Sequence, residues 1–135
     1  MNEYINKILE LADEAYKNDD VPIGAIVVYN NEIIGEGYNQ KNKTNKVIDH
    51  AEIIAINQAS EYLKDWRLDD CSLYVTLEPC QMCKEVIRQS RIKEVFYLVP
   101  SSFYNENNRE INYIRINNNS DEYKNKLSTF FKDKR

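Results

Sequence analysis

Three potential metal ligands and one further carboxylate stand out in the sequence. His50 is the only histidine of the chain, and Cys80 and Cys83 form a Cys-x-x-Cys pair. Imidazole and thiolate are ligands that zinc prefers, and three protein ligands leave a fourth tetrahedral position for water. Glu52 follows His50 by two residues and need not bind the metal. The pattern therefore predicts a catalytic Zn²⁺ site held by His50, Cys80 and Cys83.

The same residue types indicate a reaction. Two thiolates cancel the formal charge of Zn²⁺, so the site should acidify its water less than an all-histidine site would. A base is then required, and we expect Glu52 to serve as the proton shuttle. It would deprotonate the zinc-held water, hydroxide would attack an amidine carbon of a flipped base, and Glu52 would return the proton so that ammonia leaves. The pattern thus predicts a zinc-dependent hydrolytic deaminase.

The elements that must position these residues alternate between helix and strand. Helical spacing of apolar residues predicts helices over 2–18, 51–63 and 121–134. Runs of β-branched and aromatic residues predict a hairpin over 23–29 and 33–37 and further strands over 72–77, 94–99 and 111–116. Residues 105–119 contain seven asparagines, which favours a mobile loop over most of that stretch.

The cysteine pair is expected at the start of a helix that follows the strand over 72–77. Pro79 suits the beginning of this helix, and unpaired N–H groups there favour thiolate over thiol. His50 opens the helix over 51–63, so two helix starts can meet across the metal. The element order predicts an α/β fold with three layers, a mixed five-stranded sheet covered by helices.

Length and composition limit the organisation of the chain. At 135 residues and 42% hydrophobic content it can form one domain, which we place over 1–135. No run approaches the roughly 18 to 20 apolar residues of a membrane span, and no apolar signal-peptide core is present near the start. Three cysteines suit a reducing compartment and a metal, so we expect a cytoplasmic protein with no membrane partner.

The net charge of −4 is unevenly distributed. Residues 1–20 carry six acids against two lysines, whereas three other segments are basic. Two of them flank the predicted site, with Lys41, Lys43 and Lys46 before His50 and Lys84, Arg88, Arg91 and Lys93 after Cys83, and the third is the C-terminal segment with Lys124, Lys126, Lys132, Lys134 and Arg135. Each cluster taken alone is consistent with an ordinary solvated face. The adjacency of two of these clusters to the site favours a phosphate-bearing substrate.

Several motifs resemble the bacterial tRNA-specific adenosine deaminases of the cytidine deaminase-like zinc deaminase superfamily. The resemblance is strongest over about residues 20–99 and weaker in the last helix. The motifs are Val21-Pro22-Ile23-Gly24-Ala25, Gly35-Glu36-Gly37-Tyr38-Asn39, His50-Ala51-Glu52-Ile53 and Tyr74-Val75-Thr76-Leu77-Glu78-Pro79-Cys80-Gln81-Met82-Cys83.

This resemblance implies a cytidine deaminase-like fold, a homodimer, and conversion of the wobble adenosine in a tRNA anticodon stem-loop to inosine. It also implies that Asn39 and Ala51 contact the base. The chain departs from the family where Pro100-Ser101-Ser102-Phe103-Tyr104 replaces an Arg-Asp stretch that touches RNA, and at Lys84, Glu85 and Asp49. None of these departures affects the zinc ligands or Glu52.

Two alternatives remain open from the sequence. Cys71 could join His50, Cys80 and Cys83 in a closed Cys₃His structural zinc module with no catalytic water. Against this, Cys71 lies at the opposite end of the strand over 72–77, roughly 15 to 20 Å from the site if extended, so we expect it to be a small buried apolar residue. The second alternative is a free nucleobase or nucleoside deaminase of guanine or cytosine type, since those enzymes share the same chemistry.

Overall fold

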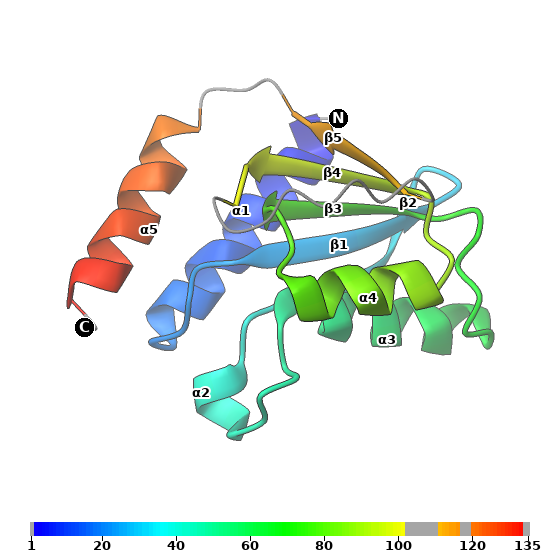
Figure 1. Cartoon of the computed structure of the whole chain (residues 1–135), viewed down its shortest axis with the longest axis horizontal. Helices are drawn as coiled ribbons and strands as arrows, with labels where there is room; N and C mark the ends of the chain where they lie inside the picture. The colour runs from blue at the N-terminus through cyan, green and yellow to red at the C-terminus, as the bar shows by residue number, and fades with distance from the viewer. Residues whose placement is uncertain (1, 102–110, 117–119, 134–135) are drawn as a thin grey trace.

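The computed structural model describes residues 2–101, 111–116 and 120–133 (Figure 1). Their helices and strands occur in the order α1 (Asn2–Lys17), β1 (Gly24–Tyr29), β2 (Glu32–Tyr38), α2 (Lys41–Thr44), α3 (Ala51–Leu63), β3 (Ser72–Leu77), α4 (Gln81–Gln89), β4 (Glu94–Val99), β5 (Asn112–Arg115) and α5 (Asp121–Asp133). Among the described residues no helix is both long and apolar enough to cross a membrane.

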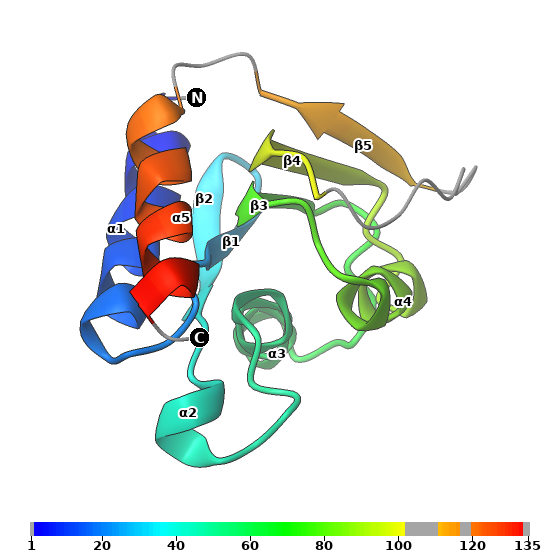
Figure 2. The ribbon, with the colours of Figure 1, turned by 60° about the vertical axis from the view of Figure 1, so that its left-hand side comes forward.

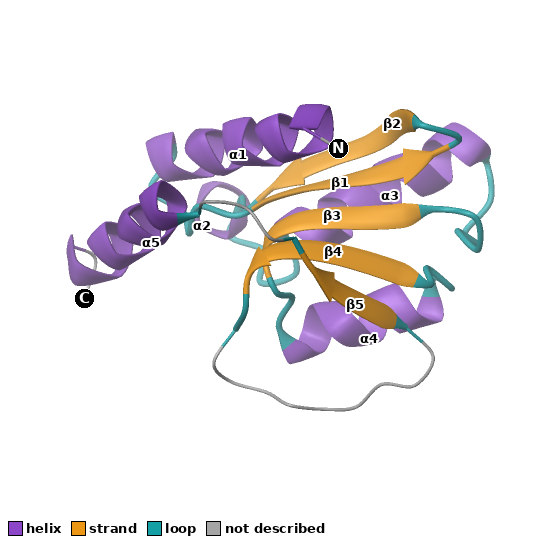
Figure 3. Ribbon diagram, turned by 90° about the horizontal axis from the view of Figure 1, so that it is seen from above, coloured by secondary structure: helices purple, strands orange, loops and turns teal. Residues whose placement is uncertain are grey.

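The strands form one mixed sheet in the order β2-β1-β3-β4-β5 (Figure 3). β1 pairs antiparallel with both β2 and β3, while β3, β4 and β5 run parallel. The parallel pair β3–β4 requires a crossover, and α4 supplies it. The start of α4 therefore lies beside the C-terminal end of β3, the edge at which α/β sheets usually bind ligands.

Helices cover both faces of the sheet, which gives the three layers expected from the sequence. α3 and α4 lie on one face, and α1 and α5 lie on the other (Figure 2). Alternate residues of β3 point to opposite layers. Leu73 and Val75 pack in the core under α3 and α4, while Tyr74 packs with Ile8 of α1 and Tyr123 of α5. The mixed five-stranded α/β fold is confirmed.

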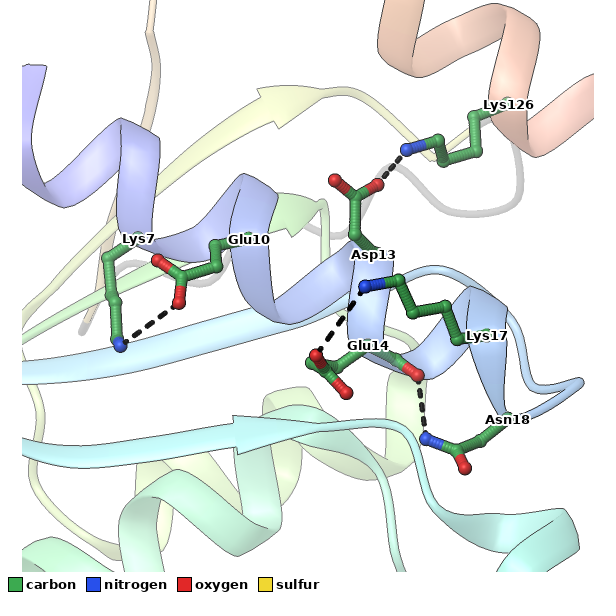
Figure 4. Close-up of polar contacts among 7 residues, drawn as sticks. All are labelled: Lys7, Glu10, Asp13, Glu14, Lys17, Asn18 and Lys126. Atoms are coloured by element: carbon green, nitrogen blue, oxygen red, sulfur yellow. Dashed lines mark hydrogen bonds and ion pairs between the residues drawn. The ribbon is translucent and has the colours of Figure 1, made fainter.

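Contacts with α1 and the end of β3 fix the position of α5. Its buried Tyr123 donates a hydrogen bond to the backbone oxygen of Pro22 at 2.6 Å, and its hydroxyl lies 2.8 Å from Oγ1 of Thr76. Lys126 of α5 pairs with Asp13 of α1 (Figure 4). Exposed pairs of this kind stabilise little, so the buried Tyr123 contacts are the stronger link.

Two glycines of β2 allow α3 to lie directly on the sheet. A Cβ atom at Gly35 would lie 2.2 Å from the backbone oxygen of Ala55, and one at Gly37 would lie 2.3 Å from that of Ala51. Neither glycine has a positive φ, so the requirement is space rather than backbone freedom. The sequence thus sets the distance between β2 and the helix that follows His50.

Replacing Gly37 with alanine should therefore displace the first turn of α3. We expect the unfolding free energy to fall by about 2 kcal/mol or more, as overpacking does elsewhere. Zinc affinity should fall as well, because His50 directly precedes the displaced turn. Urea unfolding and zinc titration test both effects, with the exposed Glu32→Ala on the same strand as control. A Gly37→Ala protein with unchanged stability would contradict this packing.

The predicted elements agree with the structure, with two differences. The short helix α2 was not expected, because four residues are too few to show a periodic pattern. Cys80 lies just before α4 rather than inside it. The predicted strand over 111–116 is present as β5, while most of the predicted loop over 105–119 lies outside the described residues.

Candidate metal and catalytic site

Two helix starts bring the predicted ligands together. His50 has an extended backbone (φ −82°, ψ 151°) and is the N-cap residue of α3. Cys80 is likewise extended (φ −70°, ψ 171°) and is the N-cap residue of α4, with Cys83 one turn further on. Because α3 and α4 lie side by side on one face of the sheet, their N-terminal ends face a common point (Figure 2).

The spacing of the three ligand atoms fits one metal ion. Nδ1 of His50 lies 3.7 Å from Sγ of Cys80 and 3.5 Å from Sγ of Cys83. Tetrahedral zinc with ordinary bond lengths places a nitrogen and a sulfur ligand about 3.6 Å apart. All three ligand atoms lie within 4.8 Å of one another. The donor set and its geometry therefore fit Zn²⁺, with Nδ1 as the ligand atom of His50.

Cys71 does not belong to this group. All three cysteines and the single histidine are described, and the possible metal ligands gather as His50, Cys80 and Cys83 only. Cys71 is 4% exposed and packs in the core near Leu68 and Leu73. Burial raises the pKa of its thiol to about 11, as expected for an unreactive buried cysteine. The closed Cys₃His alternative is wrong.

Hydrogen bonding favours thiolate at Cys80. The hydrogen bond with Cys83, followed by that with His50, lowers the pKa of Cys80 to about 3. The start of α4 adds to this effect, since unpaired backbone N–H groups there stabilise negative charge. Cys80 is exposed whereas Cys83 is buried, so one ligand faces solvent and the other lies against the core. A metal can therefore enter from the side of Cys80.

Glu52 lies in the first turn of α3 with its carboxyl group enclosed. Its side chain is 2% exposed, and Oε1 is buried without a hydrogen-bond partner. Burial, reinforced by the nearby Cys80, raises the pKa of Glu52 to about 7. A buried oxygen without a donor is costly, and a water held by a metal would supply that donor. The carboxylate thus fits a site that contains a metal ion and a water.

The raised pKa predicts a pH-dependent stability of the metal-free protein. Between pH 4.5 and about 7 the folded chain holds the Glu52 proton more tightly than the unfolded chain does. Unfolding free energy should fall as pH rises through this window, by about 3 kcal/mol in total. Glu52→Gln should remove the loss, so the variant should be the more stable protein at pH 8 and no more stable near pH 4.

Urea unfolding at several pH values measures this effect. The exposed Glu61→Gln on the same helix is the matched control and should leave the pH profile unchanged. A Glu52→Gln protein that keeps the wild-type pH profile would show that burial does not hold the Glu52 carboxyl in its neutral form.

A hydrogen bond joins Asn39 and Ala51 at the N-terminal end of α3. The backbone N–H of Ala51 donates to Oδ1 of Asn39 at 2.8 Å, and both residues are buried. This contact fixes the orientation of the Asn39 amide. Its Nδ2 group is consequently the part that can donate to a ligand.

A cluster of charged side chains beside the ligands has no signal in the sequence. Nζ of Lys84 lies 3.0 Å from Oε2 of Glu78, and each side chain is only 13% exposed. Oε1 of Glu78 accepts from the backbone N–H of Ser101 at 3.0 Å, and Lys84 lies over the ring of Tyr113. Glu78 therefore links the turn before Cys80 to α4 and to the chain after β4. Glu78 and Lys84 are six positions apart, so no local pattern indicates the pair.

The site combines a histidine and two cysteines at adjoining helix starts with a buried glutamate. This is the arrangement found in zinc-dependent base deaminases. The chain belongs to the MafB19-like deaminase family, whose profile matches residues 1–135. Its similarity to individual proteins adds detail to this assignment.

The chain is similar to proteins named tRNA-specific adenosine deaminase. That of Buchnera aphidicola subsp. Schizaphis graminum is 39% identical over 137 residues, covering 94% of this chain and 91% of the relative. That of Streptococcus pyogenes serotype M18 is 40% identical over 94 residues, covering 70% of this chain but only 59% of the relative. The match thus spans under two thirds of the streptococcal protein.

A solved structure from a study of A-to-I editing by tRNA:A34 deaminases at the wobble position of transfer RNA has the same fold. It superposes with a TM-score of 0.78 at 31% identity, covering 85% of this chain and 98% of that chain. Together with the curated relatives, this match confirms the resemblance stated from the motifs.

Proposed function

We propose that this protein hydrolytically deaminates the wobble adenosine of a tRNA to inosine. The observation that carries the proposal is the metal-ligand group His50, Cys80 and Cys83 beside the partnerless buried oxygen of Glu52. The near full-length relative named tRNA-specific adenosine deaminase supports adenosine in tRNA as the substrate. The overall reaction adds water to adenine and releases ammonia, leaving hypoxanthine in place.

His50, Cys80 and Cys83 would hold the zinc ion. When bound, zinc supplies a Lewis acid that makes water a nucleophile near neutral pH. Glu52 performs the proton transfers, taking a proton from the attacking water and delivering a proton to the departing amine. Burial raises the pKa of Glu52 in the metal-free protein to about 7, and a carboxyl group with a raised pKa suits both accepting and delivering a proton near neutral pH.

Asn39 and Ala51 are the proposed contacts to the base. With Oδ1 committed to Ala51, the Asn39 amide presents Nδ2–H, which suits a ring nitrogen or carbonyl acceptor on a purine. A substrate group that approaches the amide of Ala51 must share its N–H with Asn39. This pair would hold the flipped base against the start of α3.

The lysines around the site favour a substrate that carries phosphates. Lys41, Lys43 and Lys46 are exposed, and none forms an ion pair with another described residue. A free base offers them no partner, whereas an anticodon stem-loop does. A tRNA substrate would also place the protein in the cytoplasm.

We further propose a homodimer, as the family resemblance implies. A broad hollow between the outer faces of α3 and α4 is lined in part by Asn57, Trp66, Val86 and Arg91. Trp66 is 54% exposed there. This face suits contact with a second copy, and sedimentation equilibrium would give twice the 16.0 kDa chain mass for a dimer.

Salt dependence of binding tests whether RNA is the substrate class. The dissociation constant for an anticodon stem-loop should rise steeply with salt, with a log–log slope of about 0.7 for each phosphate contacted. The exposed Lys64→Gln, at the end of α3 opposite His50, is a control that should leave the slope unchanged. A flat response would contradict RNA binding and favour a free nucleobase or nucleoside.

A further inference from the structure

An exposed apolar pair, Val47 and Ile48, lies just before the metal-ligand residue His50 and is separated from it by Asp49. Val47 is 68% exposed and Ile48 is 51% exposed. They are the two most exposed large aliphatic side chains among the described residues. Single exposed apolar residues are common on protein surfaces, so exposure alone indicates nothing. Two adjacent exposed apolar residues beside a candidate site can indicate a binding surface if the backbone holds them in place.

The segment that carries the pair is firmly anchored. Asp20 is fully buried, and its Oδ2 accepts from the backbone N–H of Asn42 at 2.8 Å. The Asn42 side chain donates to the backbone oxygen of Asp19 at 2.8 Å. The backbone N–H of Gln40 donates to Asp49 at 2.9 Å, which closes the segment at its base. Residues 41–48 thus form a braced projection beside the start of α3 (Figures 1 and 2).

The backbone of the apolar pair is hydrogen-bonded to the metal-ligand residue. The backbone N–H of His50 donates to the oxygen of Ile48 at 2.8 Å. Only Asp49 separates the pair from His50, and the hydrogen bond from Gln40 to Asp49 holds this end of the projection next to Asn39. The pair therefore lies close to the candidate site.

The charged residues of the projection itself are mostly positive. Lys41, Lys43 and Lys46 are exposed on the same projection, and Asp49 is the single acid among residues 40–49. A partner of this surface must combine negative charge with exposed apolar faces. Loop nucleotides do so, because each carries a phosphate and an unstacked base offers an apolar face.

We propose that Val47 and Ile48 form a platform on which a base flanking the target adenosine rests, while Lys41, Lys43 and Lys46 contact its phosphates. This inference rests on the proposed function, and it assigns a contact to residues that the family resemblance does not assign. An anionic membrane offers similar chemistry, but it presents no single base to the neighbouring group His50, Cys80 and Cys83. RNA is accordingly the partner that the placement of the pair favours.

A double variant tests the platform. The full chain, loaded with zinc and carrying Glu52→Ala so that RNA is not consumed, is titrated with an anticodon stem-loop containing a wobble adenosine. Val47→Ser with Ile48→Ser should raise the dissociation constant about tenfold, the effect of losing part of two aliphatic contacts. The exposed Tyr62→Ser, on the same side of the sheet but further along α3, should leave the dissociation constant unchanged.

A second RNA separates direct contact from a structural effect. In this stem-loop, abasic nucleotides replace the two bases that flank the wobble adenosine. The parent protein should bind this RNA more weakly than the normal stem-loop. The double variant should bind the two RNAs with nearly equal affinity, because it already lacks the contact with the flanking base. The platform is wrong if the double variant, compared with the parent protein, loses the same factor in affinity for both RNAs. It is also wrong if the dissociation constant for the normal stem-loop is unchanged in the double variant.

The outcomes also separate this inference from the proposed function. If the wild-type protein deaminates the stem-loop and the double variant binds it equally well, the platform alone is wrong. If the wild-type protein neither binds nor deaminates the stem-loop, both the platform and the proposed function are wrong. Binding to phosphatidylserine vesicles that depends on Val47 and Ile48, with RNA binding unchanged, would assign the surface to a membrane and overturn the inference.

Discussion

Replacing Glu52 with alanine is expected to leave zinc bound and to lower turnover by about 10³-fold or more. Proton transfer by a positioned side chain contributes roughly 10² to 10⁴-fold, and Glu52 would act in two transfers. Zinc should remain, because the ligand group consists of His50, Cys80 and Cys83 and does not include Glu52. Metal analysis and inosine formation, measured on the same sample, give the two results together.

The control for this variant is Glu61→Ala, which removes an exposed carboxylate from the same helix and should retain full activity. Glu52→Gln offers a second comparison, because it keeps the shape of the side chain but cannot accept the proton. Retained turnover in either Glu52 variant would exclude Glu52 as the proton shuttle. Loss of zinc from Glu52→Ala would instead show that the carboxylate helps to hold the metal.

Replacing Cys83 with alanine is expected to abolish stable zinc binding. Changes to residues that merely support metal ligands weaken affinity by about 10 to 100-fold, so loss of a buried thiolate ligand should exceed that. Cys83 is fully buried and shares its metal position with His50 and Cys80 at ligand spacing. Turnover should disappear with the metal.

Cys71→Ala is the matched control, since it also removes a buried thiol. It should keep full zinc content and lose only some stability, because Cys71 packs in the core away from the ligand group. Zinc competition with a chromophoric chelator measures both variants. If Cys71→Ala lost its zinc while Cys83→Ala kept it, the open three-ligand site would be refuted.

Local patterns in the sequence predict most of the helices and strands of the fold. The helix over Ala51–Leu63 and the strands over Ser72–Leu77 and Glu94–Val99 have the bounds that periodicity and β-rich runs predict. Each of these signals lies within the element itself. The helix α2 lacks such a signal, because Lys41–Thr44 contains no apolar residue and its start is fixed by the distant Asp20.

The same distinction holds at the site. Two short motifs contain His50, Glu52, Cys80 and Cys83, so the sequence alone predicts the ligand group. The hydrogen bond from Ala51 to Asn39 could not be predicted in this way, because it depends on how β2 meets α3. Nor could the burial of the Glu52 carboxyl, which arises from the packing of α3 against the sheet and sets its pKa.

The most direct test of the account is a parallel assay of the zinc-loaded protein. One arm contains a tRNA anticodon stem-loop with a wobble adenosine, and the others contain free adenine, guanine, cytosine and their nucleosides. The account predicts inosine in the stem-loop and no ammonia from the small molecules. Ammonia from a free base or nucleoside, with an unmodified stem-loop, would contradict it and assign the site to small-molecule deamination.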